Sequence, residues 1–417
     1  MALNKPPQDK YHRVWIIFFI LGLGSLLPWN FFMTAGVYFR ERLDRQSRGE
    51  EDEQKNKTDT AVPSHSYYFR TFDNFMTLCA MLPLLIFCCL NSILHRRVPQ
   101  KIRMAGSLFG IFLLFLLTTI LIKVEITNPD VFFVITMITI IVNNSMSAVF
   151  QSSMFGLVGL LPTRYTMPPI SGQGMAGTFA AIAMIFSLSV GSNTAESAFW
   201  YFLTACVVTL FATTAYMALG YLGFAQYYLH SCSANTDNSI DAIEKVFPCT
   251  LIQLWVMALS VTTVFWVTIS VFLVVTGRVQ TISTNEYWVK FFSPVCCFLL
   301  FNVADFFGRS FTAFVMWPRE KSRLLPLFVL LRIVFIPLFL LCNIQKSLLP
   351  TIFHHDAFFI LFMIVFGTSN GYLASLAMAY GPRTIKGREA ETAGSIMMFF
   401  LALGLSLGAC SSFIFAL

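Results

Sequence analysis

Residues 131–163 read VFFVITMITIIVNNSMSAVFQSSMFGLVGLLPT, a run that contains no charged side chain. A helix needs about 20 apolar residues to cross the hydrocarbon core of a membrane. This run is long enough to cross and to include part of a loop, and similar uncharged runs recur along most of the chain. The repeated pattern predicts an all-α polytopic membrane protein.

The composition of the 417-residue chain agrees with that class. Hydrophobic residues make up 56% of it and charged residues only 12%, whereas soluble domains average about 25% charged residues. This low density of charge excludes a soluble enzyme, a disordered tail and a nucleic-acid binder. The formal net charge of +7 then indicates basic loops on the cytoplasmic side of a membrane rather than an acidic partner.

The gaps between charged residues divide the chain into eleven expected transmembrane helices. Two of these segments are interrupted by charge, because one contains Asp305 and Arg309 and another contains Arg332. The eleven segments are 14–39, 74–95, 104–122, 131–163, 165–195, 197–236, 246–277, 291–318, 324–345, 357–382 and 392–417.

The positions of Lys and Arg predict how these helices are oriented in the lipid bilayer. Short loops with basic clusters, such as 96–103 and 319–323, alternate with short loops that contain few basic residues, and basic short loops remain in the cytoplasm. We therefore expect a cytoplasmic N-terminus, a long extracellular loop at about residues 36–72 and an extracellular C-terminus. The sequon at Asn56 lies in that loop and predicts N-glycosylation there.

A polar stretch at residues 226–247 separates the first six expected helices from the last five. We interpret this stretch as a short cytoplasmic linker. It would join an N-terminal six-helix half, residues 1–225, to a C-terminal five-helix half, residues 248–417. No clear sequence repeat relates the two halves, although repeats in transporters are often undetectable in a single sequence.

The most informative polar residues lie in the sequence FLLFNVADFFGR at residues 298–309. This sequence contains an aromatic, an amide, an acidic and a basic side chain, namely Phe298, Asn302, Asp305 and Arg309. Successive members of this set are four, three and four residues apart. This spacing places them on one face of a helix. A charge at the bilayer centre costs about 2.5–3.5 kcal/mol, so opposite charges one turn apart offset one another. The stripe is a candidate substrate site, and an ion pair that only ties helices together is the alternative.

A second stripe lies in the first expected helix, close to Pro28. One helical face carries, in order, Leu26, Trp29 or Asn30, and Met33. An aromatic ring beside a thioether suits stacking on a flat ligand. Packing of these side chains into the core is an equal alternative.

Three further polar residues in or beside the apolar segments have more than one interpretation. Gln151 is a lone amide in the fourth segment, where it would either contact a ligand or hydrogen-bond to another helix. Arg332 has no obvious local partner. Glu391 lies where the last helix is expected to begin, and an interaction with the helix dipole alone would explain it.

The sequence SGQGMAG at residues 171–177 contains the pattern GxGxxG. A dinucleotide site requires this pattern between a strand and a helix, whereas here it lies within an apolar segment. Small residues at helical spacing favour close helix packing in membranes, and we expect the same of the GxxxG pairs that begin at Gly106, Gly367 and Gly404. A substrate-facing role for Gln173 or Gly174 is the alternative.

No chemical reaction is indicated by the side chains. The sequence contains no CxxC or HExxH pattern, and no nucleophile–base pair stands out. We therefore expect a protein that is not an enzyme and that needs neither a metal ion nor a cofactor.

Five motifs distributed along the chain form a specific set. They are PWNFF at 28–32, SGQG at 171–174, N-x-x-D-x-x-G-R-S at 302–310, SNGY at 369–372 and ETAG at 391–394. Together they resemble the equilibrative nucleoside transporter family, and most closely its plasma-membrane type 1 and type 2 branch. The likeness runs nearly end to end and agrees with the count of eleven helices.

The resemblance implies sodium-independent, facilitated transport of purine and pyrimidine nucleosides, with nucleobases as further substrates, across the plasma membrane. It implies a major-facilitator-like fold with a six-helix and a five-helix half that alternates access to a central cavity. Nucleoside-analogue drugs or inhibitors are further expected ligands, and a monomer is the expected state. A proton-coupled symporter that uses Asp305 or Glu391 is the alternative function, and a receptor or channel is a third.

By position, the resemblance implies roles for residues from several helices. Gln151 would hydrogen-bond the base, while Asp305 and Arg309 would bind the ribose. The remaining substrate-site residues would be Leu26, Trp29, Asn30, Met33, Met81, Leu84, Phe298 and Asn302. Phe272, Glu391 and Leu405 would complete the cavity or its gate.

Two departures from the family pattern bear on this site. Phe272 is followed by Leu273 where related sequences carry proline, so we expect the seventh helix to bend less. Ser147 stands where type 1 members tend to have glycine, a small residue linked to tight binding of bulky nucleoside-analogue inhibitors. Ser147 is therefore a candidate determinant of inhibitor sensitivity.

Overall fold

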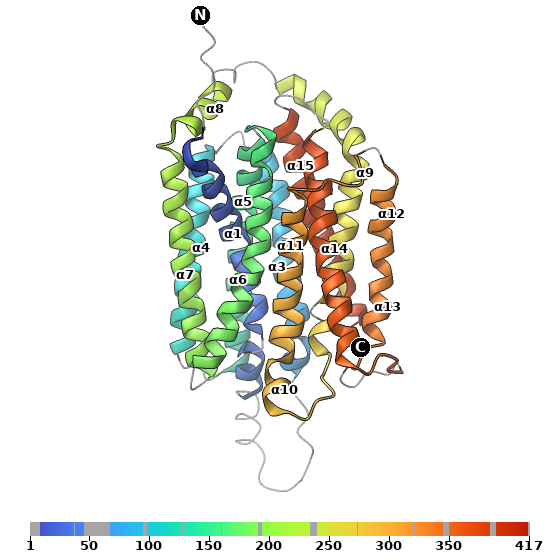
Figure 1. Ribbon diagram of the computed structural model, residues 1–417. Helices are drawn as coiled ribbons and strands as arrows, with labels where there is room; N and C mark the ends of the chain where they lie inside the picture. Colours follow the sequence, from blue (N-terminus) through green and yellow to red (C-terminus); the bar gives the residue numbers. More distant parts are fainter. Residues whose placement is uncertain are drawn as a thin grey trace, which may run out of the picture.

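The computed structural model of this chain is a bundle of helices (Figure 1). It describes residues 9–36, 38–45, 67–94, 98–124, 126, 128–159, 161–190, 194–233, 240–272, 274–320, 322–344, 350–383 and 389–415. These residues form α-helices, short 3-10 turns, a π-helical segment and two isolated β-bridges. The predicted all-α class is confirmed.

The long helices up to Leu219 largely follow the uncharged runs of the first half of the sequence, and the short helix α8 extends into the polar stretch 226–247. Long apolar helices of this kind have the composition that crosses a membrane. Their bounds are η1 Lys10–His12, α1 Arg13–Thr34, α3 Tyr67–Leu94, α4 Gln100–Lys123, α5 Pro129–Gly159, η2 Thr163–Tyr165, α6 Met167–Val190, α7 Thr194–Leu219 and α8 Gly223–Ser233.

The helices of the second half are more often interrupted, because several contain internal proline or a change of helix type. Their bounds are α9 Ile240–Phe272, η3 Thr276–Arg278, α10 Glu286–Phe292, η4 Ser293–Leu299, α11 Leu300–Phe311, α12 Leu324–Leu331, η5 Arg332–Val334, α13 Phe335–Leu340, α14 Asp356–Arg383, α15 Glu389–Ser412 and η6 Phe413–Phe415. The segment η4 is π-helical and contains Pro294.

Nine helical stretches among the described residues are long and apolar enough to cross a membrane. Two shorter apolar stretches, Leu324–Leu340 and Ile396–Ser412, fall where the ninth and eleventh spans are expected. The arrangement is therefore consistent with eleven spans. The sequon at Asn56 and part of the polar stretch 226–247 lie outside the described residues.

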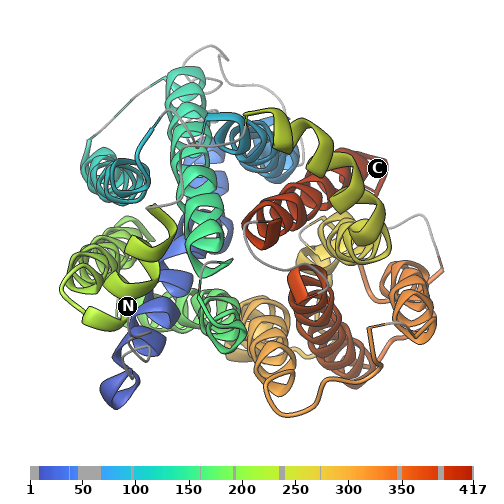
Figure 2. The same ribbon diagram turned by 90° about the horizontal axis from the view of Figure 1, so that it is seen from above.

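The long helices fall into two groups when the bundle is seen from above (Figure 2). In the first group α1 packs on α6 and α3 on α5, and in the second α9 packs on α15 and α11 on α14. Between the groups α3 contacts α15 and α6 contacts α11. At these two seams Ser406 Oγ donates to the Met81 carbonyl over 2.8 Å, and the hydroxyls of Ser171 and Ser310 lie 2.9 Å apart.

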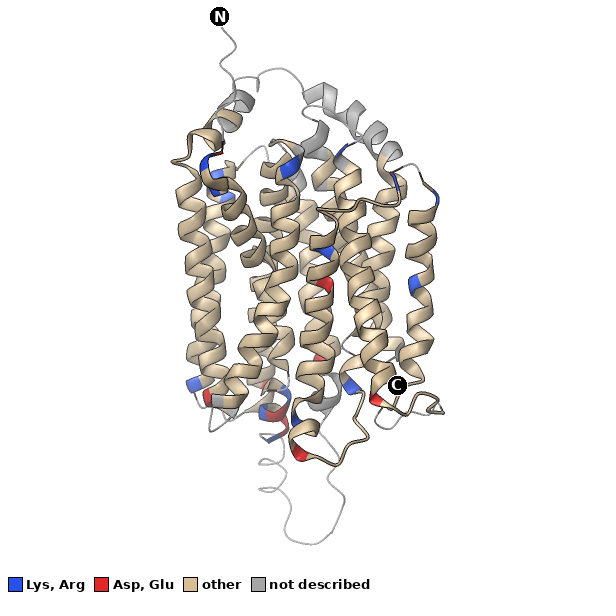
Figure 3. Cartoon of the chain, viewed as in Figure 1, with Lys and Arg blue, Asp and Glu red and all other residues tan. Residues whose placement is uncertain are grey.

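Most of the charged residues lie toward the two ends of the bundle (Figure 3). The few coloured positions between the ends lie on α11 and on the helix formed by α12, η5 and α13. These elements contain Asp305, Arg309 and Arg332, and all three residues are buried. The charges that interrupt the apolar runs of the sequence therefore face protein rather than lipid.

Glycines bring α6 close to helices of both groups. A Cβ added at Gly172 would lie 2.0 Å from the Phe19 carbonyl oxygen of α1, and one at Gly177 would lie 1.8 Å from Asn302 Oδ1 of α11. Only glycine fits such approaches, so the packing role expected for this stretch is confirmed. At Gly106 a Cβ would meet no atom within 4 Å, and the close packing expected there is wrong.

Candidate substrate site

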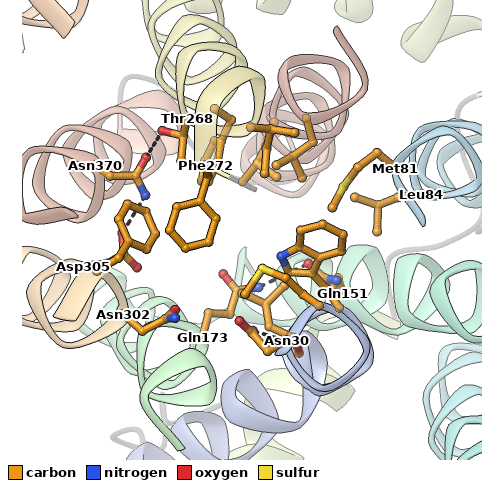
Figure 4. Close-up of a pocket in the computed structure, with 18 of the residues that line it drawn as sticks. Asn30, Met81, Leu84, Gln151, Gln173, Thr268, Phe272, Asn302, Asp305 and Asn370 are labelled. Atoms are coloured by element: carbon orange, nitrogen blue, oxygen red, sulfur yellow. Dashed lines mark hydrogen bonds between the residues drawn. The ribbon is translucent and has the colours of Figure 1, made fainter. Parts of the chain in front are cut away.

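A cavity lies between the two groups of helices (Figure 4). The space free of protein atoms in and around it is about 830 Å³, which includes space open to solvent. Most of the residues expected to bind substrate line it, namely Leu26, Trp29, Asn30, Met33, Met81, Leu84, Gln151, Asn302, Asp305 and Arg309. The expected cavity or gate residues Phe272 and Leu405 line it as well.

One wall of the cavity carries a cluster of amides from α5 and α6. Gln151 Nε2 donates to Ser147 Oγ over 2.9 Å and to the Ser25 carbonyl over 3.2 Å. Gln173 Nε2 donates to Gln151 Oε1 over 3.3 Å and to Ser25 Oγ over 3.2 Å. These contacts fix the amide of Gln151, because its nitrogen faces acceptors and its oxygen faces a donor.

The Ser25 carbonyl of α1 links that helix to α5. It accepts from Ser147 Oγ over 2.6 Å as well as from Gln151 Nε2. It lies one residue after Gly24, whose carbonyl has no in-helix donor because Pro28 has no N–H. The Ser25 carbonyl and the serine of α5 thus hold Gln151 at the cavity wall.

The opposite wall carries an ion pair from α11. Arg309 Nε donates to Asp305 Oδ2 over 2.6 Å, and Asn370 Nδ2 of α14 donates to Asp305 Oδ1 over 2.6 Å. Thr268 Oγ1 of α9 lies 2.7 Å from Asn370 Oδ1 (Figure 4). The carboxylate is therefore held on both of its oxygens by side chains from two helices.

Two asparagines lie where α1 and α11 approach α6. Asn30 Nδ2 donates to the Leu26 carbonyl, and Asn302 Nδ2 donates to the Phe298 carbonyl, each within its own helix. Their Oδ1 atoms both lie near Gly177. The two amides consequently meet at the α6 glycine, on the same side of the cavity as the seam between α6 and α11.

Aromatic and thioether side chains occupy the space between the two polar walls. Phe272 points into the cavity (Figure 4), and its ring centre lies 4.2 Å from that of Phe301. Met33, Met81 and Trp29 line the cavity from α1 and α3. Such side chains suit the faces of a flat ring.

Phe298 does not line the cavity, although its spacing in the sequence places it on the face of Asn302 and Asp305. Its ring packs edge-on against Phe272 at 6.0 Å, one layer behind the wall. Phe298 belongs to the π-helical segment η4, and π-helical turns hold more residues than α-helical turns. The helical phase therefore changes between Phe298 and Asn302.

Ser147 and Glu391 are not among the described residues that line the cavity. Ser147 is buried behind Gln151 and contacts the site only through that side chain. Glu391 lies in the first turn of α15, but its side chain is outside the described residues, as is Leu273, on which the expected bend of the seventh helix depends.

Gln173, for which a substrate-facing role was the alternative to helix packing, lines the cavity. The lining residues that were not predicted from the sequence are Asn144, Phe265, Thr268, Ile269, Phe301, Asn370 and Leu401. A signal existed for Asn144 and Asn370, because both are amides within apolar segments, as Gln151 is. No sequence signal distinguishes Thr268 or Phe301 from the many similar residues nearby.

A helical membrane bundle with a central cavity and polar groups on both walls has the architecture of a solute transporter. The proton:xylose symporter XylE of the major facilitator superfamily, solved with 6-bromo-6-deoxy-D-glucose, has a TM-score of 0.61 at 12% identity and covers 97% of this chain and 95% of its own. The human organic anion transporter MFSD10 has a TM-score of 0.56 at 13% identity, with 98% and 93% covered. These likenesses establish the predicted major-facilitator-like fold.

Sequence comparison identifies the family within that fold. The profile described as nucleoside transporter matches residues 137–417. Equilibrative nucleoside transporter 1 of Rattus norvegicus is 46% identical, with 99% of this chain and 99% of that protein covered. Equilibrative nucleoside transporter 2 of Homo sapiens is 43% identical, with 100% and 99% covered. This chain belongs to the nucleoside transporter family, and the resemblance to the type 1 and type 2 branch is confirmed.

The names of these relatives also bear on the alternatives. Both are called equilibrative transporters rather than proton-coupled ones, so the proton-coupled alternative finds no support. Both are transporters rather than enzymes. With its apolar helices, the chain is a multi-pass membrane protein.

Proposed function

We propose that this protein transports purine and pyrimidine nucleosides across the plasma membrane down their concentration gradient, without coupling to sodium or protons. One observation carries the proposal: an amide cluster and a carboxylate–guanidinium pair face the same cavity from opposite walls, with aromatic and thioether side chains between them. A nucleoside has the matching chemistry, since it joins a flat base to a hydroxyl-rich sugar without net charge.

Gln151 is the base-binding residue in this proposal. Its Nε2 group is already bound to Ser147 and Ser25, and its Oε1 atom accepts one hydrogen bond from Gln173. A carbonyl oxygen has two lone pairs. Gln151 Oε1 would therefore accept a hydrogen bond from an N–H group of the base, while Trp29 would stack on the flat face of the base.

Asp305 and Arg309 are the ribose-binding residues. The carboxylate accepts one hydrogen bond from Arg309 and one from Asn370, and a carboxylate has about four lone-pair sites. The remaining sites would accept from ribose hydroxyls, and further N–H groups of the guanidinium would donate to ribose oxygens. A pair that is neutral overall suits a neutral substrate.

Passage would follow from rocking of the two halves about this cavity. Residues 1–225 and 248–417 would form the halves, joined by the cytoplasmic linker 226–247. Leu405 of α15 lines the cavity, and Glu391 lies in the first turn of the same helix, so α15 would carry part of the gate. We further propose a monomer with a cytoplasmic N-terminus, an extracellular C-terminus and glycosylation at Asn56.

Uptake of labelled uridine into proteoliposomes tests this function. We expect saturable uptake that stops at equal concentrations inside and outside and is the same with a sodium gradient, a proton gradient or neither. Protein-free liposomes give the background. Accumulation above equilibrium under either gradient would contradict equilibrative transport, and an absence of saturable uptake would contradict transport of nucleosides. Competition by nucleobases decides whether they are also substrates.

A further inference from the structure

Arg332 is a buried cation that the proposed transport mechanism leaves unexplained. It lies in η5, within the apolar helix Leu324–Leu340, and its exposed fraction is 1%. A buried arginine in a membrane helix is expensive. It therefore requires partners, and its own helix offers none in the sequence.

The partners of Arg332 come from α9 and α14. Nη1 donates to the Phe366 carbonyl over 3.0 Å and also to Ser369 Oγ. Nη2 donates to Thr268 Oγ1 over 2.8 Å, and the guanidinium lies 4.7 Å from the centre of the Phe366 ring. These hydrogen bonds all go to neutral oxygens, so the cation is solvated by α9 and α14 rather than paired with an acid in direct contact.

One branch of this network ends at the ribose-binding carboxylate. Arg332 Nη2 lies 2.8 Å from Thr268 Oγ1 and 3.4 Å from Asn370 Oδ1, and Thr268 Oγ1 lies 2.7 Å from the same Oδ1 atom. On the other side of the amide, Asn370 Nδ2 donates to Asp305 over 2.6 Å. The chain of contacts runs from Arg332 through Thr268 and Asn370 to Asp305.

The chemistry of arginine decides which atoms donate and which accept in this series of hydrogen bonds. A guanidinium has donors and no acceptor, so Arg332 Nη2 donates both to Thr268 Oγ1 and to Asn370 Oδ1. The single hydroxyl hydrogen of Thr268 points either to Asn370 Oδ1 at 2.7 Å or to the Val264 carbonyl of its own helix at 2.8 Å. The Asn370 oxygen then faces donors, and its NH₂ group must face Asp305. Without Arg332 the amide could rotate and present its oxygen to the carboxylate, where two acceptors repel.

We propose that Arg332 is a positioning residue for nucleoside binding. It acts through Thr268 and Asn370 to hold the Asp305 carboxylate in the orientation that receives ribose hydroxyls, without touching the substrate itself. This inference rests on the proposed function, because it assumes a ribose at Asp305. It assigns a role in specificity to a residue outside the cavity wall.

The test combines variants with a matched pair of ligands. Inhibition of uridine uptake is measured for uridine and for 2′,3′-dideoxyuridine, and the ratio of their half-inhibitory concentrations reports how strongly the ribose hydroxyls are recognised. We expect a ratio of about tenfold or more in the natural protein, because hydrogen bonds to charged groups are strong. In Arg332→Gln we expect the ratio to fall to about threefold or less. A purely structural role would lower the amount of transporter and leave the ratio unchanged.

Ser369→Ala is the matched control. Ser369 accepts from Arg332 but lies outside the branch that reaches Asp305, so its variant should keep the ratio of the natural protein. An unchanged ratio in Arg332→Gln, or an equal fall in Ser369→Ala, would overturn the proposal.

Thr268 provides a second test if Arg332→Gln does not fold. Thr268→Val keeps the shape and removes the hydroxyl, whereas Thr268→Ser keeps the hydroxyl. We expect the ratio to fall in Thr268→Val and to stay at the value of the natural protein in Thr268→Ser. Equal ratios in the two variants would overturn the proposal. Where both variants fold, Arg332→Gln/Thr268→Val should show no further fall, since residues in one network are not additive. Absence of saturable uridine uptake by the natural protein would instead reject the proposed function.

Discussion

Arg309 and Asp305 are one helical turn apart on α11, and Nε donates to Oδ2 over 2.6 Å with both side chains buried. A buried ion pair adds little to stability, but loss of one partner leaves a charge that nothing offsets, at a cost of about 3–5 kcal/mol. Asn370 Nδ2 donates to the other carboxylate oxygen, Oδ1, over 2.6 Å. The pair is therefore a preformed polar site that depends on both of its members.

Asp305→Asn should lower uridine uptake per transporter by at least about tenfold. The substitution keeps the shape of the side chain but removes the acceptor charge and leaves Arg309 unpaired. Initial uptake rates, divided by the amount of protein in the membrane, measure the effect. Glu286→Gln is the matched control, because Glu286 is exposed at the start of α10 and its loss of charge should leave uptake unchanged. Normal uptake by Asp305→Asn would remove Asp305 from the site.

Ser147→Gly should tighten the binding of bulky nucleoside-analogue inhibitors by about fivefold to tenfold. The Ser147 hydroxyl accepts from Gln151 Nε2, and its removal frees that N–H for a ligand, a change worth about 1 kcal/mol. Half-inhibitory concentrations in uptake assays check this. Ser145→Gly serves as control, since Ser145 Oγ donates within its own helix to the Ile141 carbonyl. Equal shifts in the two variants would show that the glycine acts on the helix and not on Gln151.

Gly371→Ala should greatly reduce the amount of folded transporter. A Cβ at Gly371 would lie 2.0 Å from the Asp305 carbonyl oxygen and 2.9 Å from the Arg309 nitrogen, so α14 would have to move away from α11. Overpacking of this kind costs about 1–3 kcal/mol or more. Thermal denaturation in detergent measures the loss, and Gly106→Ala, where a Cβ meets no atom within 4 Å, should be neutral. A stable Gly371→Ala protein would contradict the close approach of these helices.

Phe298→Leu and Phe272→Leu should have different effects. Phe272 lines the cavity, whereas Phe298 packs behind it. We expect Phe272→Leu to raise the half-saturating uridine concentration several-fold, about the effect of one lost aromatic contact of 0.5–1.5 kcal/mol. Phe298→Leu should lower thermal stability and leave that concentration within about twofold. The reverse pattern would restore Phe298 to the substrate site, as its spacing in the sequence suggests.

The sequence determined where the helices lie and which side chains interrupt them. Uncharged runs of about 20 residues or more have the length of membrane-spanning helices, whereas spanning strands are about half as long. The run 131–163 and its counterparts therefore predict the all-α class. Residues three or four apart share a helical face for the same local reason. The spacing of Asn302, Asp305 and Arg309 is therefore enough to group them, and they line one cavity.

Only the tertiary structure decided which helices meet. Thr268 and Asn370 come from α9 and α14 and join Asp305 through contacts that span many residues of sequence. Arg332 lacks a partner in its own helix and finds its partners on those same two helices. Phe298 does not share the helical face of Asn302 and Asp305 that its spacing predicts, because it belongs to the π-helical segment η4. Local periodicity fixes directions within a helix, whereas the docking of helices depends on side-chain shape and hydrogen bonding over the whole bundle.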